Sequence, residues 1–549
     1  MDRSKLKIRP IIGMEIHVQL ATKTKLFCAC PIEFGAPPNS RVCPVCLGMP
    51  GVLPVLNRTA YEHAVRTAIA LKCEIARFTK WDRKSYYYPD LPKNYQISQY
   101  DLPLGFDGAF DVPVDDAAVS NAPADGAPAD GEPEGGRPTD GGSASGRPES
   151  GVAAGLRTGR SPRKTSGTES TGYRRVGIIR AHLEEDAGKN LHEKPGITQV
   201  DLNRTGTPLL EIVTEPDLAS ADEAYNFCVE LQRLVTYLGA SEASMQKGQM
   251  RFEPNVNVAI EYDGREYRTP IAEVKNLNSF KAVRDAIRYE IERQVSEWMA
   301  DPDYVINKRP KENRGWDDVR GVTEFQRGKE EAHDYRYFPD PDLVPVEVDD
   351  AWIESMKDSV GELPLERQAR MSSEYGLSSA DAATILADRA TADLFEEAAE
   401  AGHPPTLGKQ FISFWSAHAN ARNTTIAGLG IDAARLGELS KITADGLVNA
   451  TAAAIIAEKM LSSSDTPTAI AQREGLIQTR DEGQVQAWVE EAFTKNEKAV
   501  QDALANPKKQ QQARGFLTGQ VMKISGGKAD PKVVGKLIEE KLAKLSQDL

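Results

Sequence analysis

The clearest pattern of apolar and polar positions is a strict alternation over residues 13–20, GMEIHVQL. Its apolar side chains share one face of an expected strand: Met14, Ile16, Val18 and Leu20. Glu15 and His17 lie side by side on the opposite face. A carboxylate and an imidazole that face a cleft can bind a metal ion or transfer protons, although the same pattern also fits a solvated strand face.

Acids recur in two further strand-like segments. Residues 200–218, VDLNRTGTPLLEIVTEPDL, contain a run of Leu, Ile and Val that is interrupted by one acid, Glu211. A carboxylate buried in a strand is costly unless it is paired or bound to a cation. The strand expected at residues 176–179 leads to His182 and three consecutive acids, Glu184, Glu185 and Asp186. Adjacent carboxylates repel one another, so this segment favours either a bound cation or a solvated acidic turn.

The sequence after these segments predicts further strands of the same sheet. Residues 250–260 alternate, and Asp263-Gly264 predicts a hairpin turn before a return strand that carries Glu273 and Lys275. These last two side chains project to the same side of that strand. Several strands therefore present polar faces, which fits either a lined cleft or a half-buried antiparallel sheet with a wet face.

Periodicity of three to four residues predicts the helices. They are expected over residues 57–76 and 221–238, and from a cap at Asn278 or Ser279 to Trp298. Beyond residue 350 the pattern is all-helical, over 352–386 and 394–461, followed by a linker at 462–467 and a small helical module at 469–549. We expect three domains: residues 1–350, 351–463 and 466–549.

Residues 110–172 interrupt this pattern. They are dominated by Gly, Pro, Ala, Ser and Asp, with almost no large apolar side chains, and so cannot bury a core. We predict a disordered insertion in a surface loop between two strands, because long insertions in such loops cost little free energy.

The cysteines indicate a metal site. Cys28-x-Cys30 and Cys43-x-x-Cys46 are separated by twelve residues, a spacing similar to that of zinc ribbons. Four thiolates close a tetrahedral structural site and leave no open position for catalysis. Disulfides are the alternative, which a reducing cytoplasm disfavours.

A polar and aromatic segment, KWDRKSYYYPDLPKNYQISQ, occupies residues 80–99. Its three consecutive tyrosines lie close to the basic side chains of Arg83, Lys84 and Lys93. This mixture suits stacking on a base and holding a phosphate, but the residues alone slightly favour a tyrosine-rich loop packed on a sheet.

Charge and hydropathy narrow the class of protein. The 549 residues carry a net charge of −14, which by itself argues against a polyanionic partner. Residues 494–549, however, hold eleven Lys or Arg against six Asp or Glu, and their glycine-spaced basic sequence GFLTGQVMKISGGKADPK suits a nucleic-acid backbone. The absence of a long apolar run or an apolar leader predicts a soluble cytoplasmic protein without a membrane segment, and the acidic remainder also suits a salt-rich cytoplasm.

Taken together, the chain resembles the B subunits of the tRNA-dependent amidotransferases. The resemblance rests on ordered motifs over nearly the whole chain except the insertion: GMEIHVQL, the cysteine pairs with LGMPGVLPVLN, WDRKSYYYPDLPKNYQISQ, HLEEDAGK, DLNRTGTPLLEIVTEPD, EVKNLNSF and DYRYFPDPD. It implies an α+β protein with a cradle-like, mainly antiparallel-sheet N-terminal domain, a zinc-knob insertion, an all-α domain and a small helical tail that binds tRNA.

The resemblance also implies a reaction and its partners. ATP phosphorylates the side-chain carboxylate of mischarged Asp-tRNA(Asn) or Glu-tRNA(Gln), and ammonia then displaces the phosphate to give the amide. Ammonia comes from glutamine that is hydrolysed in the amidase, or A, subunit of a heterotrimer that also contains a small C subunit. The chain itself shows no Cys-His-Glu or Ser-Lys glutaminase arrangement.

Residue by residue, the resemblance implies a Mg2+ site formed by Glu15, His17, Glu185 and Glu211, with Glu184 as the alternative to Glu185. Histidine is an unusual Mg2+ ligand and would act directly or through water. Contacts with ATP or the acceptor end are implied for Asp82, Arg83, Lys84, Tyr88, Asn203, Arg204 and Lys275. The four cysteines match a structural Zn2+ knob that some members lack, so the chemistry does not require zinc.

Three other interpretations stay open at this point. One is the related archaeal tRNA-Gln-specific E subunit, which shares the cradle but carries an extra folded domain where this chain has its Gly/Pro-rich insertion. Another is a zinc-bearing tRNA-binding scaffold without chemistry of its own, which would not need the acids around Glu15 and Glu211. The third is a self-sufficient ligase that uses free ammonia.

Overall fold

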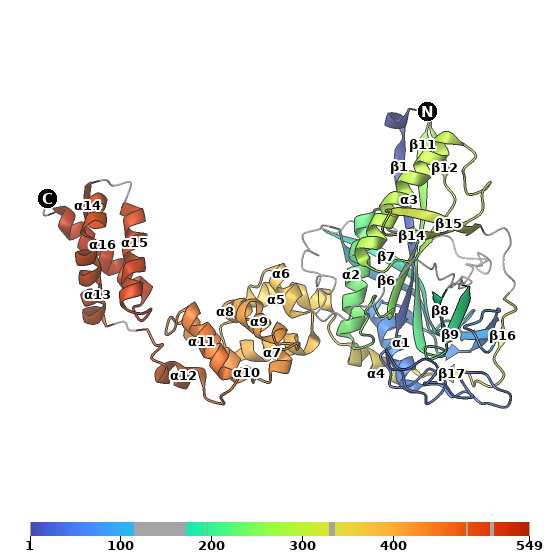
Figure 1. Ribbon diagram of the computed structural model, residues 1–549, viewed down its shortest axis with the longest axis horizontal. Helices are drawn as coiled ribbons and strands as arrows, with labels where there is room; N and C mark the ends of the chain where they lie inside the picture. The colour runs from blue at the N-terminus through green and yellow to red at the C-terminus, as the bar shows by residue number, and fades with distance from the viewer. Residues whose placement is uncertain are drawn as a thin grey trace. The chain divides into compact units, whose positions relative to one another are not determined.

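The computed structural model describes residues 2–114, 172–194, 196–328, 335–478, 481–505 and 510–547. The chain divides into two compact units, Met1–Pro364 and Leu365–Leu549 (Figure 1). Most of the predicted insertion, residues 115–171, lies outside the described residues. No described helix is long and apolar enough to cross a membrane.

The first unit is organised around a 13-stranded sheet. In spatial order its main strands are β15 (Val322–Gly328), β14 (Glu312–Asp317), β13 (Ala272–Lys275), β11 (Met250–Tyr262), β1 (Lys7–Gln19), β10 (Pro208–Thr214), β7 (Tyr173–Glu185), β5 (Tyr95–Ser98), β4 (Asp82–Ser85) and β16 (Phe338–Pro339). Off this path, β12 (Arg265–Arg268) pairs with β11, β6 (Gly105–Pro113) with β7, and β2 (Glu74–Ile75) with β6. Two-stranded sheets join β3 (Phe78–Thr79) to β17 (Val346–Glu347) and β8 (Lys189–Lys194) to β9 (Ile197–Asp201).

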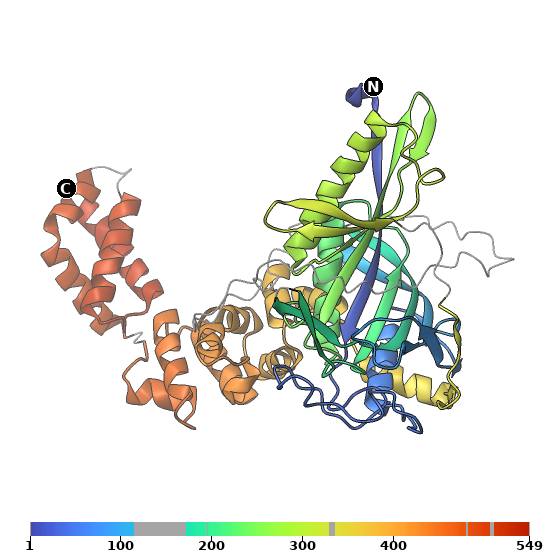
Figure 2. The ribbon, with the colours of Figure 1, turned by 45° about the vertical axis from the view of Figure 1, so that its right-hand side comes forward.

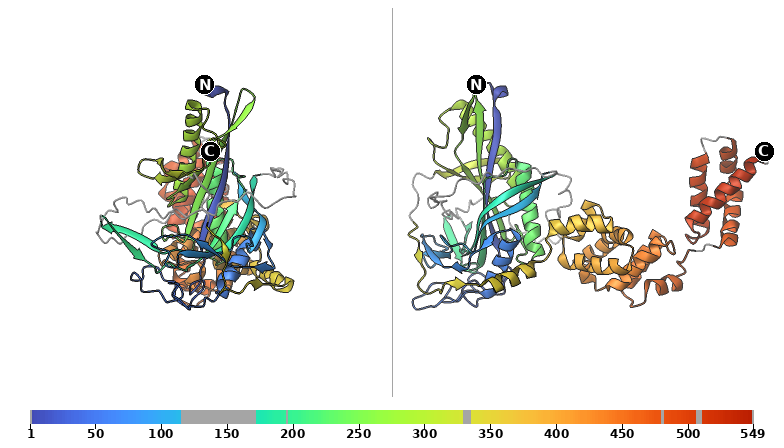
Figure 3. Two further views of the ribbon diagram at one scale, coloured as in Figure 1. Left: turned by 90° about the vertical axis from the view of Figure 1, so that its right-hand side faces the viewer. Right: turned by 180° about the vertical axis from the view of Figure 1, so that it is seen from behind.

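One face of this sheet is covered by helices (Figure 2). The predicted apolar side of β1 is buried there, and Ile16 and Val18 are fully inaccessible to solvent. The covering helices are α1 (Arg58–Ala70), α2 (Ala221–Tyr237) and α3 (Phe280–Ala300), whose apolar side chains join the same core. The views in Figure 3 show α2 and α3 on this face. The opposite, polar face of β1 therefore carries Glu15 and His17, and the α+β class expected from the sequence is confirmed.

The structure shows the helix cap and the hairpin turn that the sequence predicted, and it locates the insertion. Ser279 caps α3, with its side chain accepting a hydrogen bond from the backbone N–H of Ala282. Asp263 and Gly264 both have positive φ and connect β11 to β12, as a tight hairpin requires. The predicted start of the insertion at residue 110 was too early, because residues 110–113 are the end of β6 and the side chains of Phe110 and Val112 are buried. Pro113 of β6 pairs with Tyr173 of β7, so the insertion follows one of two adjacent antiparallel strands and precedes the other.

The second unit is helical in its described residues. Its first part contains α5 (Pro364–Tyr375), α6 (Ser379–Ile385), α7 (Arg389–Ala401), α8 (Pro404–Gln410), the π-helical turn η3 (Phe411–Trp415), α9 (Ser416–Asn420), η4 (Ala427–Leu429), α10 (Ala433–Ala444), α11 (Ala450–Met460) and α12 (Pro467–Arg473). The long helices predicted here are divided, because residues such as Gly376 and Gly430 take positive φ where one helix stops. The helix α4 (Asp350–Val360) and the short η1 (Arg3–Lys5) belong to the first unit.

The C-terminal helices form their own core. They are α13 (Glu482–Lys495), α14 (Glu497–Ala505), α15 (Gln510–Ile524) and α16 (Pro531–Gln547). Val485, Leu517 and Ile538 are fully buried in this core. This core begins at Val485 and does not include α12, although residues 469–473 were predicted as part of the C-terminal module.

Candidate functional site

Strand register brings the predicted acids and histidines together on the polar face of the sheet. His17 of β1 lies opposite Glu211 of β10, and Glu211 lies opposite His182 of β7. Two residues along the same strands, Glu15 and Glu184 project to the same face. The Nε2 atom of His17 is 3.5 Å from Glu184 Oε1, 3.6 Å from Glu211 Oε2 and 3.8 Å from Glu15 Oε1.

Glu185, which was predicted as a Mg2+ ligand with Glu184 as its alternative, lies on the other side of β7. Glu184 and Glu185 are consecutive in one strand, so their side chains point to opposite faces. Glu185 accepts hydrogen bonds from the Lys93 ammonium and from the backbone N–H of Ile97, the latter at 2.9 Å. The geometry therefore brings Glu184, not Glu185, together with Glu15, His17 and Glu211. We call these four residues the acid cluster.

His182 also belongs to this group, although no sequence pattern predicted it as a site residue. Its Nε2 atom is 3.6 Å from Glu211 Oε2, and only 3 % of its side chain is exposed. The two-residue spacing of His182 and Glu184 in a strand is the signal that would have found it.

The arrangement fits a divalent cation. Ligand atoms of Glu15, His17 and Glu211 lie within 4.8 Å of one another, and those of His182, Glu184 and Glu211 do as well. Atoms that each lie about 2.1 Å from a Mg2+ ion are separated by about 3–4 Å, which matches the spacing between His17 and its three carboxylate neighbours. Carboxylate oxygens supply the ligands that Mg2+ prefers.

The electrostatics of the cluster favour a bound cation. Burial and the negative charges of Glu211 and Glu253 raise the pKa of Glu15 to about 8. Burial alone would also raise the pKa of Glu211, but His182, His17 and Arg180 outweigh it and hold that pKa well below the usual 4.5. The Arg180 guanidinium donates a 3.2 Å hydrogen bond to Glu211. A cation would let Glu15 ionise beside a carboxylate that is already charged.

A ladder of alternating charges continues the polar face towards β14. Glu253 of β11 lies opposite Glu15, and the Lys275 ammonium is 2.6 Å from carboxylate oxygens of both Glu253 and Glu273. Lys311, 2.8 Å from Glu273, was not predicted from the sequence because it belongs to no motif. Burial lowers the pKa of Lys311 to about 8, against the attraction of Glu15.

The polar and aromatic segment forms β4 and β5 and contributes to both faces of the sheet. Asp82 and Glu184 both lie opposite Ser98, so Asp82 and Lys84 share the face of the acid cluster. Arg83 points the other way and contacts Asp340 at 2.7 Å. The half-buried Tyr88 packs edge-on against Tyr86, outside the cluster.

Asn203 and Arg204, predicted to contact the substrate, hold the protein's own backbone. Asn203 Oδ1 accepts a hydrogen bond from the Arg41 N–H at 2.7 Å, and its Nδ2 donates to the carbonyl oxygen of Pro37 at 2.7 Å. The Arg204 guanidinium donates to the carbonyl oxygens of Ala187 and Gly188. These contacts join the turn before β10 to the cysteine loop and to the segment after β7.

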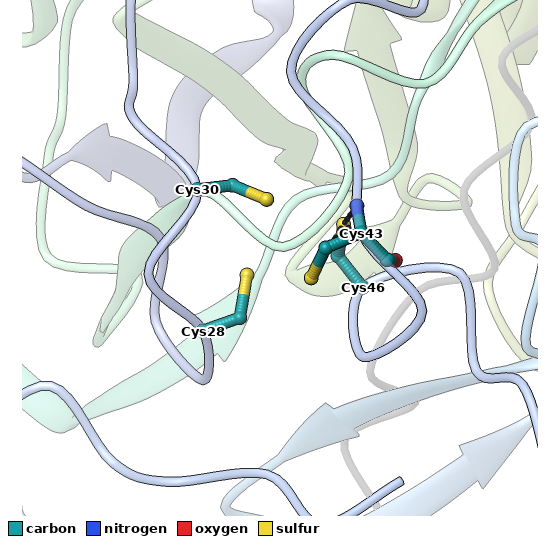
Figure 4. Close-up of side chains that lie close together, drawn as sticks. All are labelled: Cys28, Cys30, Cys43 and Cys46. Carbon is teal, nitrogen blue, oxygen red and sulfur yellow. Dashed lines mark hydrogen bonds between the residues drawn. The ribbon is translucent and has the colours of Figure 1, made fainter.

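The four clustered cysteines converge as expected. The sulfur atoms of Cys28, Cys30, Cys43 and Cys46 lie within 4.8 Å of one another and point towards a common centre (Figure 4). None of the cysteines, in the part of the chain that the structure describes, forms a disulfide. A hydrogen bond from Cys28 lowers the pKa of the Cys46 thiol to about 4 although burial opposes this shift. The cluster can therefore hold a tetrahedral metal ion.

Comparison with known proteins identifies two matching families along the chain. Residues 10–354 match the GatB/GatE catalytic domain, and residues 393–542 match the GatB domain. The first match alone covers more than half of the chain and contains every member of the acid cluster.

Curated relatives match over the full length. The chain is 41% identical over 546 residues to the B subunit of the aspartyl/glutamyl-tRNA(Asn/Gln) amidotransferase of Rhodopirellula baltica, covering 98% of each chain. It is 39% identical over 541 residues to the protein of the same name from Brevibacillus brevis, covering 98% of this chain and 100% of the relative. The same name is carried by a Caldanaerobacter subterraneus relative that is 39% identical over 544 residues.

Proposed function

The chain belongs to the B-subunit family of the aspartyl/glutamyl-tRNA(Asn/Gln) amidotransferases, and on this premise we propose that its acid cluster is the carboxylate-activating site of such an enzyme. This enzyme is a carbon–nitrogen ligase built from several subunits. The observation that carries the assignment of the site is the convergence of Glu15, His17, Glu184 and Glu211 on one polar face.

The proposed substrates are ATP and mischarged Asp-tRNA(Asn), Glu-tRNA(Gln) or both. Transfer of a phosphoryl group to a side-chain carboxylate brings two anions together, and bound Mg2+ would neutralise charge between them. Lys84 and Lys275 lie at the edges of the acid cluster, where an ammonium group can orient phosphate or carboxylate oxygens. The ligands proposed for the cation are Glu15, His17, Glu184 and Glu211, with His182 beside them.

The remaining steps require other chains. We propose that ammonia comes from glutamine hydrolysed by the amidase, or A, subunit, that a small C subunit completes the heterotrimer, and that the enzyme acts in the cytoplasm. The basic excess of residues 494–549 supports a tRNA-binding role for the C-terminal helices, because lysines that contact phosphates bind nucleic acid without reading its sequence. Full-length coverage of relatives that are named as B subunits favours this assignment over the E-type subunit.

The direct test uses this chain co-purified with its amidase partner. Mischarged tRNA, ATP, Mg2+ and ammonium chloride are supplied without glutamine, and amidated tRNA and released phosphate are both measured. We expect one phosphate for each amide formed, and no product when ATP or Mg2+ is omitted. A complex that binds the tRNA but consumes no ATP would instead support the scaffold interpretation.

The two neighbouring acids of β7 offer a matched pair of variants. Glu184→Gln is expected to raise the Mg2+ concentration for half-maximal amidation about 10–100-fold, because it removes a proposed ligand. Glu185→Gln should leave this Mg2+ requirement close to that of the wild type, because its side chain contacts Lys93 on the other face. The measurement is the Mg2+ titration of ammonium-dependent amidation, and the reverse order of the two variants would return Glu185 to the site.

We also propose that the cysteine cluster holds a structural Zn2+ ion. The double variant Cys43→Ser, Cys46→Ser is expected to lose the zinc ion, about one per chain, that the purified wild type contains. It should retain most of its ammonium-dependent amidation, since four thiolates leave no open position for substrate. Cys73→Ser, outside the cluster, is the control and should keep its zinc. Zinc content by mass spectrometry decides the first point, and loss of amidation in a folded double variant would contradict the second.

A further inference from the structure

A buried lysine lies directly beside the cysteine cluster. Lys25 has 0 % of its surface exposed, which places it among the largest fully buried side chains of the described residues. A lysine is almost never fully buried unless its ammonium group is paired. The Lys25 ammonium donates a hydrogen bond to the sulfur of Cys46 at 3.6 Å.

The backbone around Lys25 fixes it against the cluster from both sides. Its N–H donates to the carbonyl oxygen of Cys30 at 3.0 Å, and the next residue, Leu26, donates to the carbonyl oxygen of Gly206 at 2.8 Å. A Cβ atom on Gly206 would be 3.6 Å from both Lys25 Cδ and Cys46 Cβ, so the lysine stem and the cysteine are closely packed at this turn. The local fold therefore holds the Lys25 ammonium group next to the Cys46 sulfur.

Charge explains why a cation would be placed there. Four thiolates around a Zn2+ ion carry a net charge of −2, and burying that charge beside protein is costly unless it is offset. Lys25, Cys28 and Cys46 line one pocket with a volume of about 260 Å3. Lys93 and Glu185 line the same pocket and contact each other, so their charges are already balanced.

We propose that Lys25 is a positioning residue of the metal centre: its ammonium group hydrogen-bonds the Cys46 thiolate, offsets one negative charge of the metal-bound cluster and tightens metal binding. This inference rests on the proposed zinc site and extends it to a residue outside the four ligands. It also accounts for a buried lysine that plays no part in the acid cluster on the other face of the sheet.

The test compares zinc affinity by competition with a chromogenic chelator in the full-length chain. Lys25→Met keeps the length of the side chain but removes the charge and the N–H donors, and we expect it to weaken zinc binding about 10–100-fold. Lys25→Arg keeps a donor and a charge and should recover most of the affinity. Lys23→Met, at an exposed lysine two residues earlier, is the matched control and should bind zinc as the wild type does.

A spectroscopic readout separates this role from simple packing. In the cobalt-substituted protein, removing a hydrogen bond to a thiolate changes its electron donation, so the sulfur-to-cobalt charge-transfer band should shift in Lys25→Met and not in Lys23→Met. Circular dichroism establishes that each variant is folded. If Lys25→Met does not fold, Lys25→Gln, which keeps an N–H donor without the charge, replaces it and should show a smaller loss of affinity.

The outcomes are distinct. Wild-type affinity and an unshifted cobalt band in Lys25→Met, with zinc bound normally to the wild type, would overturn the role of Lys25 alone. A wild-type chain that binds no zinc would overturn the zinc site itself, and the role of Lys25 with it.

Discussion

Replacing Glu211 with glutamine is expected to reduce ammonium-dependent amidation of mischarged tRNA about 100- to 1,000-fold. The Glu211 carboxylate lies near the imidazoles of His17 and His182 and near the Arg180 guanidinium. Glutamine keeps the shape but removes the negative charge, so the cation would lose its central ligand and the transition state would lose the electrostatic stabilisation that a preorganised site supplies.

The measurement is the single-turnover rate of amide formation by the complex with its amidase partner. Glu215→Gln, an exposed acid four residues along the chain, is the control and should retain wild-type rates. Binding of mischarged tRNA should be unchanged in both variants, because only 1 % of the surface of Glu211 is exposed. A folded Glu211→Gln variant as active as the wild type would remove the acid cluster from the chemistry.

The largest expected effect on stability lies elsewhere, at Glu290 of α3. This carboxylate is fully buried and accepts hydrogen bonds from Arg293, at 2.8–3.2 Å, and from Thr323, while the Arg314 guanidinium lies 3.1 Å away. Glu290→Gln removes the fully buried counter-charge that Arg293 and Arg314 share and leaves them only the half-buried Glu312, and breaking such a group costs about 3–5 kcal/mol.

Local unfolding of α3 measures this cost. Hydrogen exchange of peptides from residues 280–300 should report an opening free energy lowered by about 3–5 kcal/mol in Glu290→Gln. Glu292→Gln, whose wild-type side chain is 62 % exposed, should change it by less than about 0.5 kcal/mol. Equal protection in the wild type and Glu290→Gln would contradict the assignment.

The same group predicts how stability depends on pH. Burial opposes ionisation of Glu290, but the hydrogen bonds and charges of Arg293, Thr323 and Arg314 outweigh it and lower its pKa below 4.5. A lowered folded-state pKa means that the carboxylate contributes its full stabilisation above pH 4.5, and that this is lost as the pH falls through the lowered pKa. Glu290→Gln should therefore flatten the acid side of the stability profile.

Local sequence patterns predicted the strands that carry the site better than they predicted which residues belong to it. The alternation in β1 determined which face Glu15 and His17 occupy, because a strand has only two faces and the apolar set must be buried. The sequence did not show which of the acids after His182 faces the cluster, because consecutive residues of a strand point to opposite faces. Only the pairing of β7 with β10, which is a tertiary contact, selects Glu184 over Glu185.

Residues that act across long sequence separations were the ones that the sequence could not place. Lys311 reaches Glu273 on the polar face because β14, which begins at the next residue, pairs in parallel with β13, and no local pattern in the sequence predicts this pairing. Asn203 appeared suited to a substrate contact, but its partners Arg41 and Pro37 lie more than 160 positions earlier in the chain. The local sequence around a polar loop residue does not show whether its side chain binds a ligand or another loop of the protein.

The connection between β6 and β7 is a site where another segment could be inserted into the first unit. Pro113 and Tyr173 face each other across one rung of the sheet, so whatever lies between them leaves and re-enters at neighbouring atoms. A purification tag, a fluorescent domain or a shortened turn exchanged between these residues would not need to alter any other strand, since the ends it must bridge are already held together. The chain could thus be labelled or trimmed there while the acid cluster, built on β1, β7 and β10, kept its register.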